Sequence, residues 1–348
     1  MRFAIVLHED GDIYNRWQNS CNKFGIAYDE IYITRADWLE QCLQKPYDCF
    51  LLRPPGLIQR YKQLYDERMY VLAKILGKKT YPTYEELIIH ENKRMLSYFL
   101  KAKQIPHVPT SIFYNKKEAL SHISNMSYPV VAKTAIGGSG SGVAFLYNTQ
   151  DATRYIIKAF GKGIARRFGP NKHTGNIKTW TQKTLLSPSF ALKKIRTYLN
   201  IFNDRQQGYV IFQQYIPHTF EWRVVCIGES FFGHKKIKIG EKASGSKGID
   251  YCPPPAKLLY FCKDIMSANN FTSMAIDCFE TSDGNYLINE MQTIFGHVQT
   301  HILEVNATPG RYLYRNDQWE FEAGNFNTNE SYDLRLQHVL SMLHESKK

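Results

Sequence analysis

The chain has 348 residues, 43% of them hydrophobic, which excludes a single small core or a disordered chain and favours two or three lobes. Its formal net charge of +12 predicts an acidic partner, such as a nucleotide, an acidic or phosphorylated sugar, nucleic acid or an anionic membrane surface. The seven cysteines are odd in number and include no Cys-x-x-Cys pair, which favours reduced thiols over a disulfide framework or a zinc site.

Residues 1–80 alternate short apolar runs with helix-spaced segments. Strands are predicted at 3–7, 31–33 and 49–52, and helices at 14–24, 38–43 and 57–76. Strands separated by helices predict a parallel sheet whose loop ends are available to ligands. The apolar run at the N-terminus is too short for a signal peptide, and no segment reaches the ~18 apolar residues of a membrane span. We therefore expect a soluble, cytoplasmic protein.

A helix predicted at 84–102 is followed by a cluster of glycines and serines. Two β-rich segments, 128–134 and 143–147, flank the residues Gly137, Gly138, Ser139, Gly140, Ser141 and Gly142. No Gly-Lys-Ser/Thr follows, so this is not a P-loop. A glycine hairpin between strands can close its backbone N–H groups over phosphates, and Lys133 ends the strand before it. A flexible hairpin with a solvent-exposed lysine is the alternative.

The segment 158–205 carries most of the positive charge. It holds eleven Lys and Arg residues, among them Arg166 and Arg167, against one acid, Asp204, so it contributes about +10 of the +12. Its apolar residues are spaced three to four apart, which is typical of a basic amphipathic helix that meets an anionic surface or acceptor. A solvated helical insertion is the alternative.

The next segments read as strands. Residues 209–213 form a predicted strand that ends near Pro217, and its exposed end could offer backbone hydrogen bonds to a flat base. Another strand begins at Arg223, which is either a phosphate clamp or an exposed charge. A helix is predicted at 258–268 and a last one at 332–344.

Two carboxylates are brought together by a predicted hairpin at residues 272–293. A two-residue turn at Asp283 and Gly284 places Asp277 directly opposite Glu290, whereas a four-residue loop makes them diagonal neighbours on the same face. Gln292 shares that face. Like charges so placed repel unless a cation joins them, and oxygen donors suit magnesium. Two surface acids on a polar face are the alternative.

Taken in order, these features of residues 80–310 resemble the ATP-grasp superfamily, which includes D-alanine–D-alanine ligase and glutathione synthetase. The resemblance implies an α/β fold in which an N-terminal parallel α/β domain precedes two α+β lobes that clasp ATP. It implies four ranges: 1–80 for the first domain, 81–208 for the lobe with the glycine flap and the insertion 158–205, 209–310 for the lobe with the metal site, and 311–348 for a C-terminal tail and helix.

The resemblance also assigns roles to residues. Lys93, Lys133 and the flap would bind phosphates, and Glu221 would bind the ribose. The adenine would meet the backbone of Gln213, Gln214, Tyr215 and Ile216. Arg223, with Lys235 or Lys242, would stabilise the transferred phosphoryl group. Asp277, Glu290 and Gln292 would hold the metal, with Gln292 standing where the family usually has Asn.

The implied activity is that of a carboxylate–amine ligase that uses ATP and one or two Mg²⁺ ions, with Mn²⁺ as a substitute, and forms an acyl phosphate. The sequence from Lys242 to Ser246 resembles a loop of superfamily members encoded with surface-polysaccharide genes. We therefore expect an acidic saccharide as acceptor, and contact between segment 158–205 and that acceptor or the inner face of the membrane.

Two other functions remain open. Some relatives are kinases that phosphorylate a small molecule or sugar without ligation, and they share the same nucleotide and metal residues. A basic nucleic-acid-binding protein without catalysis is the second. Against nucleic acid as a partner stand the lack of a reader motif and the Asp277–Glu290 pair, which would repel a polyanion.

Overall fold

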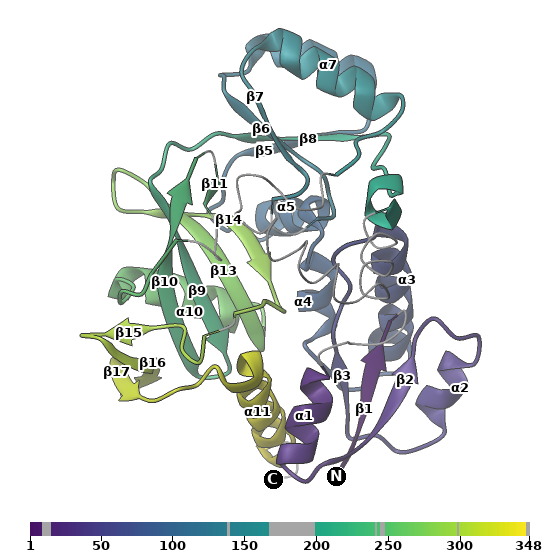
Figure 1. Cartoon of the computed structure of the whole chain (residues 1–348), viewed down its shortest axis with the longest axis vertical. Coiled ribbons are helices and arrows are strands. Elements are labelled where there is room, and N and C mark those ends of the chain that lie inside the picture. Colours follow the sequence, from purple (N-terminus) through teal and green to yellow (C-terminus); the bar gives the residue numbers. More distant parts are fainter. Residues whose placement is uncertain are drawn as a thin grey trace, which may run out of the picture. The chain divides into compact units, whose positions relative to one another are not determined.

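The computed structural model describes residues 1–8, 15–137, 140–166, 199–240, 242–243, 248–297 and 299–345. The chain forms two compact units (Figure 1), which we describe separately. The larger unit comprises Met1–Pro55, Gln63–Val108 and Ile216–Lys348, and the smaller comprises Gly56–Lys62 and Pro109–Tyr215. In contrast to the four ranges taken from the sequence, residues 81–108 and the C-terminal tail fold in the same unit as the N-terminal sheet.

The larger unit begins with the predicted parallel sheet, whose strand order is β2-β1-β3-β4; its fourth strand, β4, was not predicted. Side chains of β1 alternate between two apolar cores, because successive residues of a strand point to opposite faces. One face packs against α1 and α11, which lie side by side (Figure 1), and the other against α2 and α3. The bounds are β1 Arg2–Leu7, β2 Ala27–Tyr32, β3 Cys49–Leu52, β4 Thr80–Tyr81, α1 Arg16–Lys23, α2 Trp38–Leu43, α3 Gln59–Tyr70 and α11 Tyr332–Glu345.

Two predicted helices are each divided. The helix expected at 57–76 is α3 followed by a π-helical turn, Val71–Ile75. The helix expected at 84–102 is two helices, α4 (Tyr84–Ile89) and α5 (Lys93–Ala102). The break occurs because Glu91 is left-handed, with φ of 48°, and the Asn92 side chain caps α5 by accepting a hydrogen bond from the Met95 N–H at 3.2 Å.

The second sheet of the larger unit has nine strands and runs β14-β13-β9-β10-β16-β15, with β11 and β12 on β10 and β17 on β16. The predicted tail thus contains two of its strands, β16 and β17. The bounds are β9 Phe220–Ile227, β10 Ser230–Ile239, β11 Lys242–Ala243, β12 Ile249–Asp250, β13 Ser273–Glu280, β14 Tyr286–Gln292, β15 Glu304–Val305, β16 Thr308–Arg315 and β17 Gln318–Ala323.

The two faces of this sheet differ. One is largely apolar, although Lys235 lies on it, and packs against α10 (Ala256–Ala268) together with α4 and α5. The other is apolar at one end, where Val225, Phe232 and Ala275 meet Phe295 and the C-terminal residues. Its other end carries charged side chains, and these form the site described below.

The smaller unit is an antiparallel sheet in the order β5-β8-β6-β7, covered by α6 and α7. The predicted glycine hairpin is confirmed, because β6 and β7 pair from Val130↔Leu146 to Lys133↔Val143. The bounds are β5 Thr110–Phe113, β6 Val130–Lys133, β7 Val143–Leu146, β8 Val210–Gln214, α6 Lys116–His122, a 3₁₀ turn Ile123–Asn125, and α7 Thr149–Phe160. Residues 167–198, most of the basic insertion, lie outside the described residues.

Candidate functional site

A buried carboxylate, Asp277, lies at the centre of the charged end of the larger sheet. Arg223 donates to it twice, from Nε at 2.7 Å and from Nη2 at 2.8 Å, and the Lys236 ammonium donates at 2.8 Å. The strands impose this arrangement, because Asp277 on β13 pairs with Arg223 on β9. Only 2% of Asp277 is exposed, so its charge depends on these three bonds.

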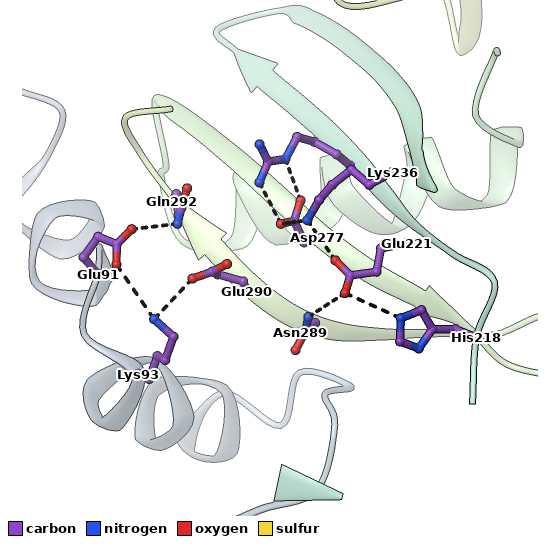
Figure 2. Close-up of polar contacts among 10 residues, drawn as sticks. Glu91, Lys93, His218, Glu221, Lys236, Asp277, Asn289, Glu290 and Gln292 are labelled. Carbon is purple, nitrogen blue, oxygen red and sulfur yellow. Dashed lines mark hydrogen bonds and ion pairs between the residues drawn. The ribbon is translucent and has the colours of Figure 1, made fainter. Parts of the chain in front are cut away.

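The network continues across the sheet through Lys236, which also donates to Glu221 at 2.8 Å. Glu221 accepts a further hydrogen bond from the Asn289 amide at 3.3 Å, and the His218 imidazole lies 4.0 Å away. Figure 2 shows this row of alternating charges. Neighbouring residues therefore hold both Arg223 and Lys236 on the same face of the sheet.

The electrostatics keep these groups charged. Burial opposes ionisation of Asp277, but Arg223 and Lys236 outweigh it and hold the pKa of its carboxyl below the ordinary value. Burial likewise disfavours the Lys236 ammonium, yet Asp277 and Glu221 raise its pKa. The result is a fixed pair of cations around one fixed anion.

A second group lies beside the first, where α5 begins. The Lys93 ammonium is 3.4 Å from Glu290 on β14 and 3.8 Å from Glu91 in the break between α4 and α5. Gln292 donates from Nε2 to Glu91 at 2.9 Å. Figure 2 shows Lys93 between the two carboxylates. These contacts are longer and less buried than those of Asp277.

The predicted juxtaposition of Asp277 and Glu290 is confirmed, although neither predicted loop forms. Thr281 pairs with Asn285, so three residues, 282–284, form the turn. That turn alone would misalign the two acids by one residue. On β14, Asn289 is an extra residue between the partners of Asp277 and Cys278. This bulge shifts the register by one residue and places Asp277 directly opposite Glu290.

The structure corrects the choice of lysine. The Lys235 ammonium lies over the rings of Phe220 and Trp222, at 4.6 and 5.0 Å from their centroids, on the opposite face from Arg223. Lys236, not Lys235, lies on the same face as Arg223. Successive strand residues point to opposite faces, and Lys236 pairs with Glu221. Sequence reasoning missed Lys236, Asn289 and Glu91. Lys242 lies on β11, and its side chain is outside the described part.

The oxygen donors of the site differ in how well they suit magnesium. Among the described residues, no group of three or more His, Cys, Asp and Glu side chains is arranged to hold a metal ion. A carboxylate has about four lone-pair sites, and Asp277 uses three of them on cations. The carboxylate of Glu290, whose side chain is 26% exposed, and the carbonyl oxygen of Gln292 fit better. Mg²⁺ usually takes one or two protein ligands and completes its shell with water and phosphate.

In the smaller unit, the base of the glycine flap is tightly built. The Thr134 N–H donates to the Gly142 carbonyl at 2.9 Å, and a Cβ on Gly142 would stand 1.7 Å from the Thr134 hydroxyl, so only glycine fits there. Lys133 ends β6 just before this turn. Gly137, Gly140 and Ser141 are described, whereas Gly138 and Ser139 are outside the described residues.

The predicted adenine strand is β8, which is an interior strand. Gln213 and Gln214 pair with β6, and Gln213 also pairs with β5. The ladder ends at Gln214, so Tyr215 and Ile216 lie beyond it and are better placed for backbone contacts with a base. Their predicted role stays a prediction.

One basic residue of the insertion is not on its surface. Arg166 is 2% exposed, donates to Asp204 at 2.6 Å, and would meet a Cβ placed on Gly137 at 3.1 Å. The expectation that Arg166 contacts an acceptor is therefore wrong, because Asp204 binds it beneath the flap.

Next to Arg223 lies a group of aromatic and imidazole side chains. The His234 ring is 5.4 Å from His297 and 5.8 Å from Tyr251, and the Tyr251 hydroxyl is 3.0 Å from His297 Nε2. Burial lowers the pKa of His234 to about 3, assisted by Arg223, and burial lowers that of His297 to about 4. Both rings are neutral at physiological pH.

All seven cysteines are free thiols, and only Cys252 is not buried. Within the described part of the chain, no helix has the length and hydropathy needed to span a bilayer.

Comparison with known proteins bears on the fold. The family model for the carbamoyl-phosphate synthase L chain, ATP binding domain, matches residues 92–172, which include Lys93, Lys133 and the flap. Among curated proteins, none matches the chain by sequence.

Solved structures resemble the chain over most of its length. A RimK domain protein ATP-grasp from Sphaerobacter thermophilus is 17% identical, with a TM-score of 0.51, over 84% of this chain and 90% of that one. D-alanine–D-alanine ligase from Bacillus anthracis is 12% identical, with a TM-score of 0.56, over 99% of both. The biotin carboxylase domain of a Hydrogenobacter thermophilus carboxylase, in complex with magnesium ADP and bicarbonate, is 14% identical, with a TM-score of 0.53, over 84% and 64%. The chain therefore has the ATP-grasp fold.

Proposed function

We propose that this protein is an ATP- and magnesium-dependent carboxylate–amine ligase that forms an acyl phosphate. The observation that carries the proposal is the pairing of fixed cations with carboxylates on one sheet face: Arg223 and Lys236 around Asp277, beside Lys93 and Glu290. Two of the similar proteins support the same activity, because one is a D-alanine–D-alanine ligase and the other forms a complex with magnesium ADP.

Phosphoryl transfer requires charge neutralisation and alignment rather than a protein nucleophile. In the first step the substrate carboxylate oxygen attacks the γ-phosphorus, the bond to the β-phosphate oxygen breaks, and ADP leaves. Arg223 and Lys236 would stabilise the transferred charge, because Asp277 and Glu221 already orient them and little reorganisation is needed. The amine nitrogen then attacks the acyl carbon, phosphate leaves with the electron pair, and the amine gives up a proton.

Magnesium, when bound, would supply charge neutralisation at the β- and γ-phosphates. Glu290 and the Gln292 carbonyl are the residues we propose to hold it, and Mn²⁺ should substitute. Lys93 and, in the smaller unit, Lys133 with the glycine flap would bind phosphate oxygens, while Tyr215 and Ile216 would meet the base.

The finer proposal concerns the acceptor. An acidic saccharide, as in surface-polysaccharide biosynthesis, would suit the charge of segment 158–205, about +10, as would peripheral contact with an anionic membrane. Arg166 takes no part in it. The test replaces four basic residues by Gln: Arg167, Lys193, Lys194 and Arg196. Weaker acceptor binding with unchanged ATP binding would support this assignment.

The activity is tested with a pool of amino acids and uronic acids, ATP, magnesium and hydroxylamine. An acyl phosphate reacts with hydroxylamine to give a hydroxamate, so a ligase releases ADP and hydroxamate in equal amounts. ADP with a stable phosphorylated product and no hydroxamate would indicate a kinase instead. Neither product, together with steep salt-dependent binding to nucleic acid, would indicate the non-catalytic alternative.

A further inference from the structure

Gln292 stands where the ATP-grasp superfamily usually has Asn. Its side chain has a hydrogen-bond partner that explains how a Gln can act as a metal ligand there. Its Nε2 donates to the Glu91 carboxylate at 2.9 Å. A carboxylate in such a contact accepts, so the amide must present its N–H to Glu91 and direct its carbonyl oxygen the other way. The extra methylene of Gln, compared with Asn, gives the amide the reach to make this contact.

Glu91 is placed for this contact by an unusual backbone. It lies in the break between α4 and α5 with φ of 48°, a left-handed conformation that is costly for a residue other than glycine. Without the break the two helices would run on as one, and residue 91 would follow the helix. Glu91 is also only 8% exposed, although it is charged. Strain and burial of this kind persist only where surrounding contacts over-determine them.

The second contact of Glu91 links it to the same site. Lys93 lies 3.8 Å from Glu91 and 3.4 Å from Glu290 (Figure 2), so one carboxylate neighbours both the phosphate-binding lysine and the amide of Gln292. Hydrogen-bond partners behind metal ligands orient those ligands and affect metal affinity by about 10–100-fold.

We infer that Glu91 is a positioning residue that orients Gln292 so that its carbonyl oxygen, together with Glu290, can bind the divalent cation. This inference rests on the proposed function.

The test is a double-mutant cycle with Mn²⁺ as the probe and a non-hydrolysable ATP analogue present. Four proteins are compared: wild type, Glu91→Ala, Gln292→Asn and the double variant. The apparent Mn²⁺ dissociation constant and the electron paramagnetic resonance spectrum of the bound ion are measured. We expect Glu91→Ala to weaken Mn²⁺ binding roughly tenfold in the Gln292 background and by less than about twofold in the Asn background.

Glu91→Gln separates the two contacts of Glu91. It keeps an acceptor for the Gln292 amide and removes the charge facing Lys93, so we expect Mn²⁺ affinity within about threefold of wild type. Glu85→Ala, an exposed acid on α4 paired with Lys74, is the matched control and should leave Mn²⁺ binding unchanged. Thermal unfolding without metal verifies that each variant is folded.

Several outcomes would overturn the inference. An equal loss in both backgrounds, or a Glu91→Gln variant as weak as Glu91→Ala, would show that Glu91 acts through Lys93 or as a ligand itself. No loss at all in a folded Glu91→Ala variant would show that Gln292 needs no positioning. If wild type binds neither nucleotide nor Mn²⁺, the proposed function fails as well, which is a different result.

Discussion

The two charged groups on the larger sheet are built differently. Around Asp277 the contacts measure 2.7–2.8 Å and the carboxylate is 2% exposed, whereas around Lys93 they measure 3.4 and 3.8 Å and the Glu290 side chain is 26% exposed. Buried charges are tolerated only when fully bonded, so the first group is fixed before any ligand arrives. The second group is held less tightly, so Lys93 and Glu290 could separate to bind the phosphate and the metal that we propose for them.

This contrast predicts its largest effect at Asp277. Asp277→Asn keeps the shape but leaves Arg223 and Lys236 buried around a neutral group, so unfolding free energy should fall by about 3–5 kcal/mol. Urea denaturation measures it. A change below about 1 kcal/mol would mean that the surrounding charges are solvated and the two groups are alike.

Acid should destabilise the protein in two steps. His234 and His297 have folded-state pKa values of about 3 and about 4 against an ordinary 6.5, so their stability contribution is complete above pH 6.5 and is lost as pH falls toward 4. The loss should reach roughly 2 kcal/mol for each histidine between pH 7 and 5. Asp277, whose pKa is lowered, contributes above its ordinary 3.8 and loses that contribution only at lower pH.

Melting temperature against pH checks this order. His297→Asn should reduce the upper step by about half, because His234 still contributes to it, and should leave the lower step in place. A constant melting temperature from neutral pH down to about pH 5 would contradict the neutral, buried state of the two rings.

Two adjacent lysines sharpen the comparison. Lys236→Met removes the donor that Asp277 and Glu221 share. It should lower the free energy of unfolding by about 2–3 kcal/mol and abolish hydroxamate formation. Lys235→Met, its matched control, removes only contacts with Phe220 and Trp222 and should cost about 0.5–1 kcal/mol, with activity retained. If Lys236→Met and Lys235→Met both fold and lose activity equally, the assignment of Lys236 to the site and Lys235 to the opposite face is wrong.

The smallest effect on folding is expected at Glu290. Glu290→Gln should change unfolding free energy by less than about 1 kcal/mol, because its ion pair is partly exposed. Magnesium-dependent nucleotide affinity should nevertheless fall about tenfold or more. Titration of the ATP analogue with and without magnesium measures nucleotide affinity in the two conditions. An equal loss of affinity in both would argue against Glu290 as a metal ligand.

Much of the fold followed from periodicity. Three strands of the parallel sheet and the glycine hairpin were predicted because short apolar or β-rich runs are local features, whereas β4 was missed. The pairing of Asp277 with Glu290 was also predicted, but through a turn that does not form; the three-residue turn and the bulge opposite Asn289 cancel each other.

Other features depended on contacts that no local pattern reveals. A Lys-Lys pair within a strand does not show which lysine faces the site until the register with β9 is known. Apolar spacing continues across 84–102, so the break at Glu91 could not be anticipated. Arg166 resembled one more surface charge until Asp204 was found beside it.

The most direct measurement is calorimetric titration of the purified protein with a non-hydrolysable ATP analogue, with magnesium and then with a chelator. We expect saturable binding that depends on magnesium and is weakened in the Glu290→Gln variant. Absence of any nucleotide affinity at millimolar analogue with magnesium present would contradict the proposal that these carboxylates and cations form a nucleotide site.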